Sequence, residues 1–133
     1  MMTVQEAIAH ADRVLIHQKA SAAEGDKDPR WQAVIAVADF IPTEPEPIWQ
    51  FVCRWAELQD DDLRNALSTC VLEHILEYHF EKFFPLVKIA VRRNEAIADV
   101  FLRCWKFGLS EVPENAVHYE KLRKELKTGR KGK

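Results

Sequence analysis

The sequence predicts an all-α fold, a single domain of about seven helices that pack as antiparallel hairpins. Apolar residues recur at helical spacing in successive segments, and no segment alternates with period two for long enough to form a strand. Only four of the 133 residues are glycine, which argues against a turn-rich β domain. At 47% hydrophobic residues, a chain of this length buries a core without help from a metal or a disulfide.

The helices predicted in the first half begin at recognisable capping signals. Thr3 and Glu6 have the spacing of a capping box, in which each side chain bonds the backbone amide of the other residue. Asp28 followed by proline is typical of a helix start, because proline fits the first turn. Pro42, Pro45 and Pro47 interrupt the chain before the third helix. These helices are expected over residues 3–20, 29–40 and 47–58.

The longest predicted helix, residues 61–82, determines the architecture. One apolar face carries Leu63, Leu67, Cys70, Val71, His74 and Tyr78. Nearly the opposite face carries Leu72, Ile75, Leu76, His79 and Phe83. A helix that is apolar on two sides packs between neighbours, so we expect this helix to be central and buried. The short connections to the following helices favour stacked hairpins of the HEAT type.

Three further helices complete the predicted domain, which spans residues 1–127. Pro85 is expected to restart the chain as a short helix ending near Val91. Asn94 caps the next helix, which has Trp105 on its inward face and ends at Gly108 in a left-handed conformation. The last helix covers residues 113–127. Residues 128–133 are expected to form a basic, disordered tail.

The net charge of −2 conceals two oppositely charged parts. Residues 1–119 carry 12 Lys and Arg against 19 Asp and Glu, whereas residues 120–133 carry 7 against 2. An acidic body repels nucleic acid and favours basic partners. The sequence therefore makes a basic protein surface the expected partner and nucleic acid an unexpected one.

The middle of the chain resembles an uncharacterised bacterial family of small all-helical, HEAT-like domains of unknown function. The resemblance covers about residues 29–122 and rests on the runs LEHILEYHF from Leu72, VRRN from Val91 and FLRCWKFGLS from Phe101. In that family an "LE-x-LL" helix precedes a helix that ends in "W-x-x-G". The resemblance implies a fold and a bacterial origin, and it implies no catalytic residue.

The leading functional hypothesis is a non-enzymatic protein-binding or inhibitory module, such as an immunity protein, that masks a basic partner surface. Glutamates four residues apart form one acidic row on the long helix, although such a row disfavours the isolated helix. Trp49 is predicted to be exposed as an aromatic anchor in an interface. The expected partner-binding residues are Trp49, Asp60, Asp61, Asp62, Glu73, Glu77 and Glu81.

Two alternative functions remain open. The basic C-terminal helix favours a nucleic-acid accessory protein, although the sequence contains no nucleic-acid motif. An enzyme of unknown chemistry would need at least two of His74, Glu77 and His79 to converge in one cleft.

The sequence gives no reason to expect a cofactor or a metal. It contains no glycine-rich nucleotide loop, and its five histidines match no metal-binding spacing. The three cysteines form no C-x-x-C pair and are expected to be reduced core thiols. With no signal peptide and no apolar run long enough for a membrane span, the chain is predicted to be cytoplasmic.

Overall fold

The computed structural model describes residues 2–17 and 28–131, and within these ranges it is all-α with no β-strand, as predicted. The elements are α1 (Val4–His17), α2 (Pro29–Ala38), α3 (Pro45–Ala56), α4 (Asp61–Ala66), the π-helix η2 (Leu67–Leu72), α5 (Glu73–Arg93), α6 (Glu95–Leu102), the 3₁₀ helix η3 (Gly108–Glu111) and α7 (Pro113–Lys131). The HEAT-like helix order stays a prediction.

The capping signals of the sequence act as expected. Glu6 N–H donates to Thr3 Oγ1 at 3.1 Å, and Thr3 N–H donates to Glu6 Oε1 at 3.0 Å. Asp28 accepts from Arg30 N–H at 2.7 Å. Asn94 accepts from the first two amides that follow Glu95. These side chains satisfy amides that have no partner inside the helix, so they fix where the helices begin.

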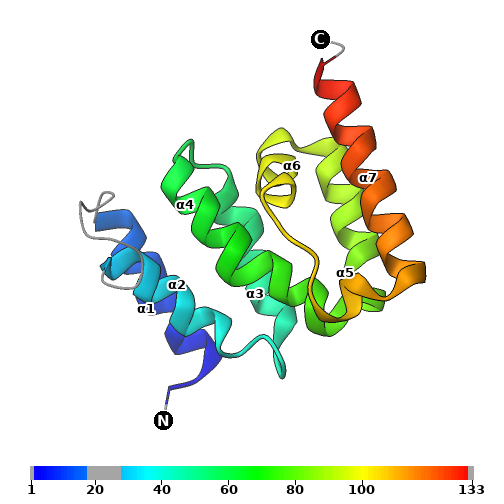
Figure 1. Ribbon diagram of the computed structural model, residues 1–133. Helices are drawn as coiled ribbons and strands as arrows, with labels where there is room; N and C mark the ends of the chain where they lie inside the picture. The colour runs from blue at the N-terminus through cyan, green and yellow to red at the C-terminus, as the bar shows by residue number, and fades with distance from the viewer. Residues whose placement is uncertain (1, 18–27, 132–133) are drawn as a thin grey trace.

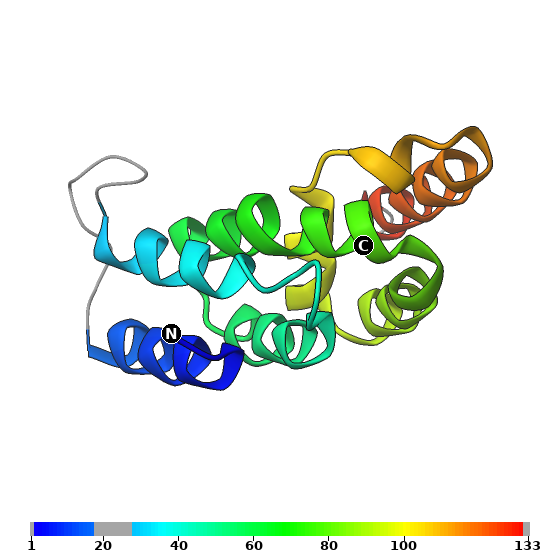
Figure 2. The same cartoon turned by 90° about the horizontal axis from the view of Figure 1, so that it is seen from below.

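The continuous segment formed by α4, η2 and the first turns of α5 crosses the middle of the molecule (Figure 1). Leu67, Val71 and Leu72 are fully buried. η2 packs against α2 on one side and against α3 and α6 on the others. Figure 2 shows α2 and this segment in one layer, with α1 and α3 beneath them. The prediction of a buried central helix is confirmed.

The central segment differs from the uninterrupted helix predicted over residues 61–82 in two places. Residues 67–72 are π-helical, and the hydroxyl of Thr69 donates to the carbonyl of Asn65 at 2.8 Å. The chain then leaves the helical conformation at His79 (φ −135°, ψ 41°), where the imidazole Nε2 lies 2.8 Å from the carbonyl oxygen of Ile41. Pro85 was expected to restart the chain, but it lies inside the helix that continues to Arg93.

The segment after α6 is also different from the prediction. α6 ends at Leu102, and the predicted inward-facing Trp105 is 66% exposed. Gly108 has the positive φ that was expected, +52°, but it opens η3 and does not end α6. A Cβ at this glycine would lie 2.6 Å from Glu77 Cγ, so close packing on α5 requires glycine here.

The last helix ends later than predicted. α7 continues to Lys131, whereas the sequence predicted its end at Lys127 and a disordered tail from residue 128. Residues 132–133 of that tail lie outside the described residues. The described part of α1 ends at His17, so the predicted end at residue 20 and most of the loop at 21–28 also lie outside them.

Candidate binding surface

The three glutamates predicted to form one acidic row are not on one surface. Glu73 is 5% exposed and its Oε2 accepts the backbone N–H of Trp105 at 2.9 Å. Glu77 is half-buried, with Oε1 2.6 Å from His74 Nδ1. Glu81 is exposed, but the break at His79 separates it from the other two, so the four-residue helical spacing no longer applies. The predicted acidic row is therefore wrong.

The three aspartates before α4 have internal partners. Asp60 caps α4 through Leu63 N–H at 3.0 Å and pairs with the buried Arg30 at 2.7 Å, and these interactions lower the pKa of its carboxyl despite its partial burial. Asp62 accepts the indole N–H of Trp31 at 3.0 Å. Asp61 is exposed and pairs with Arg103, 2.9 Å away. The aspartates therefore hold helices together and do not form an unpaired acidic face.

For Trp49 and Trp105, the exposure in the structure is the reverse of the prediction. Trp49 is half-buried and packs against the core, so the prediction of an exposed anchor at this position is wrong. Trp105 is the exposed tryptophan, because α6 ends three residues before it. The apolar spacing that made Trp105 resemble a core residue continues past the point where the helix stops.

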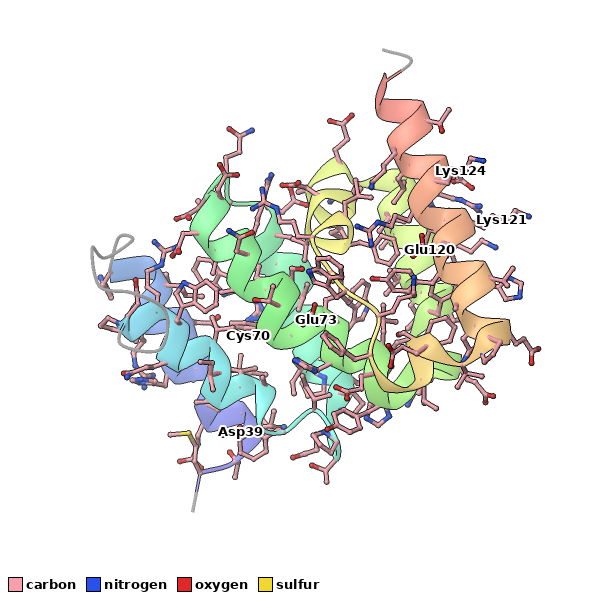
Figure 3. All side chains as sticks on the ribbon, in the orientation of Figure 1. Asp39, Cys70, Glu73, Glu120, Lys121 and Lys124 are labelled. Atoms are coloured by element: carbon pink, nitrogen blue, oxygen red, sulfur yellow. The ribbon has the colours of Figure 1, made fainter. Side chains whose placement is uncertain are left out.

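A cleft of about 410 Å³ lies between α2 and the η2–α5 segment. We call it the α2–α5 cleft; its walls are Ile35, Ala38, Asp39, Ile41, Pro42, Thr69, Cys70, His74 and Tyr78. Figure 3 labels Asp39, directly after the end of α2, and Cys70 on η2. None of the nine wall residues is lysine or arginine, and Asp39 is the one carboxylate among them. The cleft is thus largely apolar with a negative charge at its edge.

Next to the cleft, on the side of the segment after α6, lie further aromatic side chains. The ring of Phe107 stacks on His74, with the ring centroids 6.0 Å apart and the planes at 18°. Phe107 is 42% exposed, and Tyr78, one helical turn after His74, is 51% exposed. Exposed aromatic rings beside an apolar cleft are typical of protein-binding surfaces. The sequence did not predict this site, because the π-helix η2 and the kink in the helix at His79 determine which side chains meet there.

Of the three residues proposed for an enzyme, His74 and Glu77 are in contact, with 2.6 Å between Nδ1 and Oε1, and His79 is directed elsewhere. His74 lines the α2–α5 cleft and contacts Glu77, whereas His79 is turned to the Ile41 carbonyl. The thiol of Cys70, also in the cleft wall, has a raised pKa because of burial, so it is a poor nucleophile at neutral pH. Within the described ranges no group of three or more His, Cys, Asp or Glu side chains is placed to hold a metal.

Buried side chains hold the segment after α6 that carries Trp105 and Phe107, which we call the aromatic segment. Glu73 bonds Trp105 N–H, and Cys104, one residue earlier, is buried with its Sγ 3.3 Å from Ser68 Oγ. Tyr119 on α7 is fully buried against Phe101, with 4.9 Å between the ring centroids. These contacts fix where the segment leaves α6, and with it the positions of Trp105 and Phe107.

Comparison with protein-family models, curated protein sequences and solved structures found no match for this chain. Among the described helices, none combines the length and the apolar composition that crossing a membrane requires.

Proposed function

We propose that this protein acts by binding another protein at the α2–α5 cleft, and that the partner inserts a basic side chain next to an apolar one. The observation that carries the proposal is the composition of the cleft wall. Its apolar walls end at a single carboxylate and an exposed tyrosine ring. An inhibitory or immunity role, and the absence of catalysis, remain predictions from the sequence.

Charge complementarity selects the basic side chain. The carboxylate of Asp39 is exposed and makes no ion pair or side-chain hydrogen bond with any described residue. Tyr78 offers a ring face on the same cleft. A guanidinium group satisfies both, since it pairs with a carboxylate and stacks on an aromatic ring. An acidic partner segment would be repelled by Asp39 and by the neighbouring Glu77.

Apolar contacts supply most of the expected affinity. Ile35 is 37% exposed at the mouth of the cleft, and Phe107 extends the surface beyond His74. Removing a central aromatic side chain from an interface of this kind costs about 2 kcal/mol, or roughly 30-fold in affinity. Rim charges change the rate of association more than they change the affinity.

The test is selection of binding peptides from a random displayed library against the folded protein. We expect the enriched peptides to contain arginine or lysine next to a large apolar residue. Their affinity should fall about 30-fold on Tyr78→Ala and several-fold on Asp39→Asn. The matched controls are Ile89→Ala, where the side chain is 52% exposed on the far half of α5, and Glu114→Gln at the start of α7.

Two results contradict the proposal. The first is enrichment of peptides without a basic residue. The second is selected peptides that bind Tyr78→Ala as tightly as the unchanged protein while losing affinity on Ile89→Ala. Either result would place the binding surface outside the α2–α5 cleft.

A further inference from the structure

α7 carries a surface that the proposed binding cleft does not use. One side of the helix packs on α5 and η3 through Tyr119 and Leu122, both buried. The other side is polar, and Figure 3 shows Lys121 and Lys124 pointing away from the remaining helices. With 19 residues the helix is about 28 Å long. The helix therefore has an extended polar side, the exposed edge of α7, directed away from the rest of the molecule.

Two glutamates of α7, Glu120 and Glu125, each form an ion pair with a cation from another part of the chain. Glu120 pairs with Lys106 and also lies in the field of Arg123 and Lys127, which together lower the pKa of its carboxyl. Because three cations surround one carboxylate, this part of α7 has an excess of positive charge.

A similar arrangement surrounds Glu125, five residues later. Glu125 pairs with Arg92 at 2.8 Å and lies in the field of Lys88 and Lys121, and the ion pair with Arg92 lowers the pKa of its carboxyl. Glu95 is the further carboxylate that borders this end of α7. Positive charge therefore exceeds negative charge over residues 120–127 of α7, although residues 1–119 are acidic.

The edge lacks what a protein interface needs. In the described part of α7 after Tyr119, no large apolar side chain is among the strongly exposed ones, and the aromatic ring of Tyr119 is itself buried. Protein interfaces depend on apolar anchors, and single-stranded nucleic acids bind by stacking on exposed rings. Binding to the phosphate backbone of a duplex needs neither, because it depends on cations.

We propose that the exposed edge of α7, formed by Lys121, Lys124 and Lys127 with the half-buried Arg123 beside them, binds the phosphate backbone of duplex nucleic acid without sequence preference. The three lysines follow one another at intervals of three residues, so each lies about one helical turn from the next. Lysine suits this contact because it is a flexible point charge. The acidic remainder of the chain limits the contact to α7.

The experiment is fluorescence anisotropy of a labelled 20-base-pair duplex, DNA and RNA in turn, titrated with the full chain over a series of salt concentrations. Four cations give an expected slope of log K against log salt of about −4, since each neutralised phosphate contributes about −0.9. The triple variant K121Q/K124Q/K127Q should lose at least about tenfold in affinity at low salt, and its slope should fall to about −1.

Two further variants keep the result interpretable. R13Q/R54Q/K82Q removes the same amount of charge from α1, α3 and α5, and it should change the affinity less than threefold. K121R/K124R/K127R keeps the charge and should restore binding. Circular dichroism shows whether each variant is folded, and all substituted side chains are largely exposed.

The proposal is overturned if the duplex does not bind at low salt, or if both glutamine triples weaken binding equally. Saturable binding of polyglutamate without binding of duplex would assign the edge to an acidic protein, and it would also overturn the proposal. Tyr78→Ala changes the α2–α5 cleft and leaves α7 unchanged, so this variant should bind the duplex as tightly as the unchanged protein does. Failure of one proposal is therefore distinguishable from failure of the other.

Discussion

The buried carboxylate of Glu73 provides the most direct test of how the aromatic segment is positioned. Its Oε2 accepts Trp105 N–H at 2.9 Å, and its side chain is 6% exposed. A hydrogen bond contributes about 0.5–1.5 kcal/mol to stability, and a buried amide left without a partner costs about 1–3 kcal/mol. We therefore expect Glu73→Leu to lower the free energy of unfolding by about 2 kcal/mol near pH 5. Glu73→Gln keeps an acceptor oxygen and should change the free energy of unfolding by less than about 1 kcal/mol.

The pH dependence of the same variants separates the hydrogen bond from the charge. Burial raises the pKa of the Glu73 carboxyl above its ordinary value of 4.5. An acid whose pKa is raised by folding binds its proton more tightly in the native state. The unchanged protein therefore loses stability as the pH rises from about 4.5 through the raised native value. Glu73→Gln cannot titrate, so it should gain stability relative to the unchanged protein over this range.

The assay is urea unfolding at pH 5 and pH 8, combined with amide hydrogen exchange at Trp105. Glu73→Leu should expose the Trp105 amide to faster exchange, whereas Glu73→Gln should keep it protected. The reasoning is refuted if Glu73→Gln shows the same pH dependence as the unchanged protein. It is also refuted if Glu73→Leu leaves the Trp105 amide as protected as before.

Two other substitutions and one thiol-reactivity measurement test the packing of the helices that carry the two surfaces. Thr3→Ala removes the capping box of α1 and should cost about 1 kcal/mol in thermal unfolding. Arg30→Leu removes the buried partner of Asp60 and should cost about 3 kcal/mol in urea unfolding. Burial raises the pKa of Cys53 to about 11 and that of Cys104 to about 12, so less than about 0.1% of either thiol is ionised at pH 7.5. A colorimetric disulfide reagent should therefore react slowly with both in the native protein and rapidly in urea.

Local signals in the sequence predicted the parts of the fold that depend on local chemistry. The starts of α1, α2 and α6 follow from short-range bonds between a capping side chain and nearby amides. The burial of the central segment follows from apolar residues on two opposite faces. Both features are fixed within a few turns of helix, so spacing alone is sufficient to find them.

The candidate site depends on features that spacing does not contain. The π-helical turns of η2 shift the register of the side chains after Leu67, and the turn at His79 depends on a carbonyl 38 residues earlier in the chain. The end of α6 depends in the same way on Glu73, 32 residues before the amide that it binds. The prediction from helical periodicity treated the helix as uninterrupted at each of these places. It therefore predicted a single acidic row and an inward-facing Trp105.

The number of acidic residues in a segment does not show which of them are free to bind a ligand. The acidic residues were correctly counted, but their partners come from distant parts of the chain: Arg30 for Asp60, Trp31 for Asp62 and Arg103 for Asp61. A carboxylate with such a partner stabilises the fold and is not available to a ligand. Asp39 differs because the described residues give it no partner, and it lies on an apolar cleft. An unpaired charge is therefore a better guide to a binding surface than a high local density of charge, and for this chain it selects the α2–α5 cleft over the aspartates before α4.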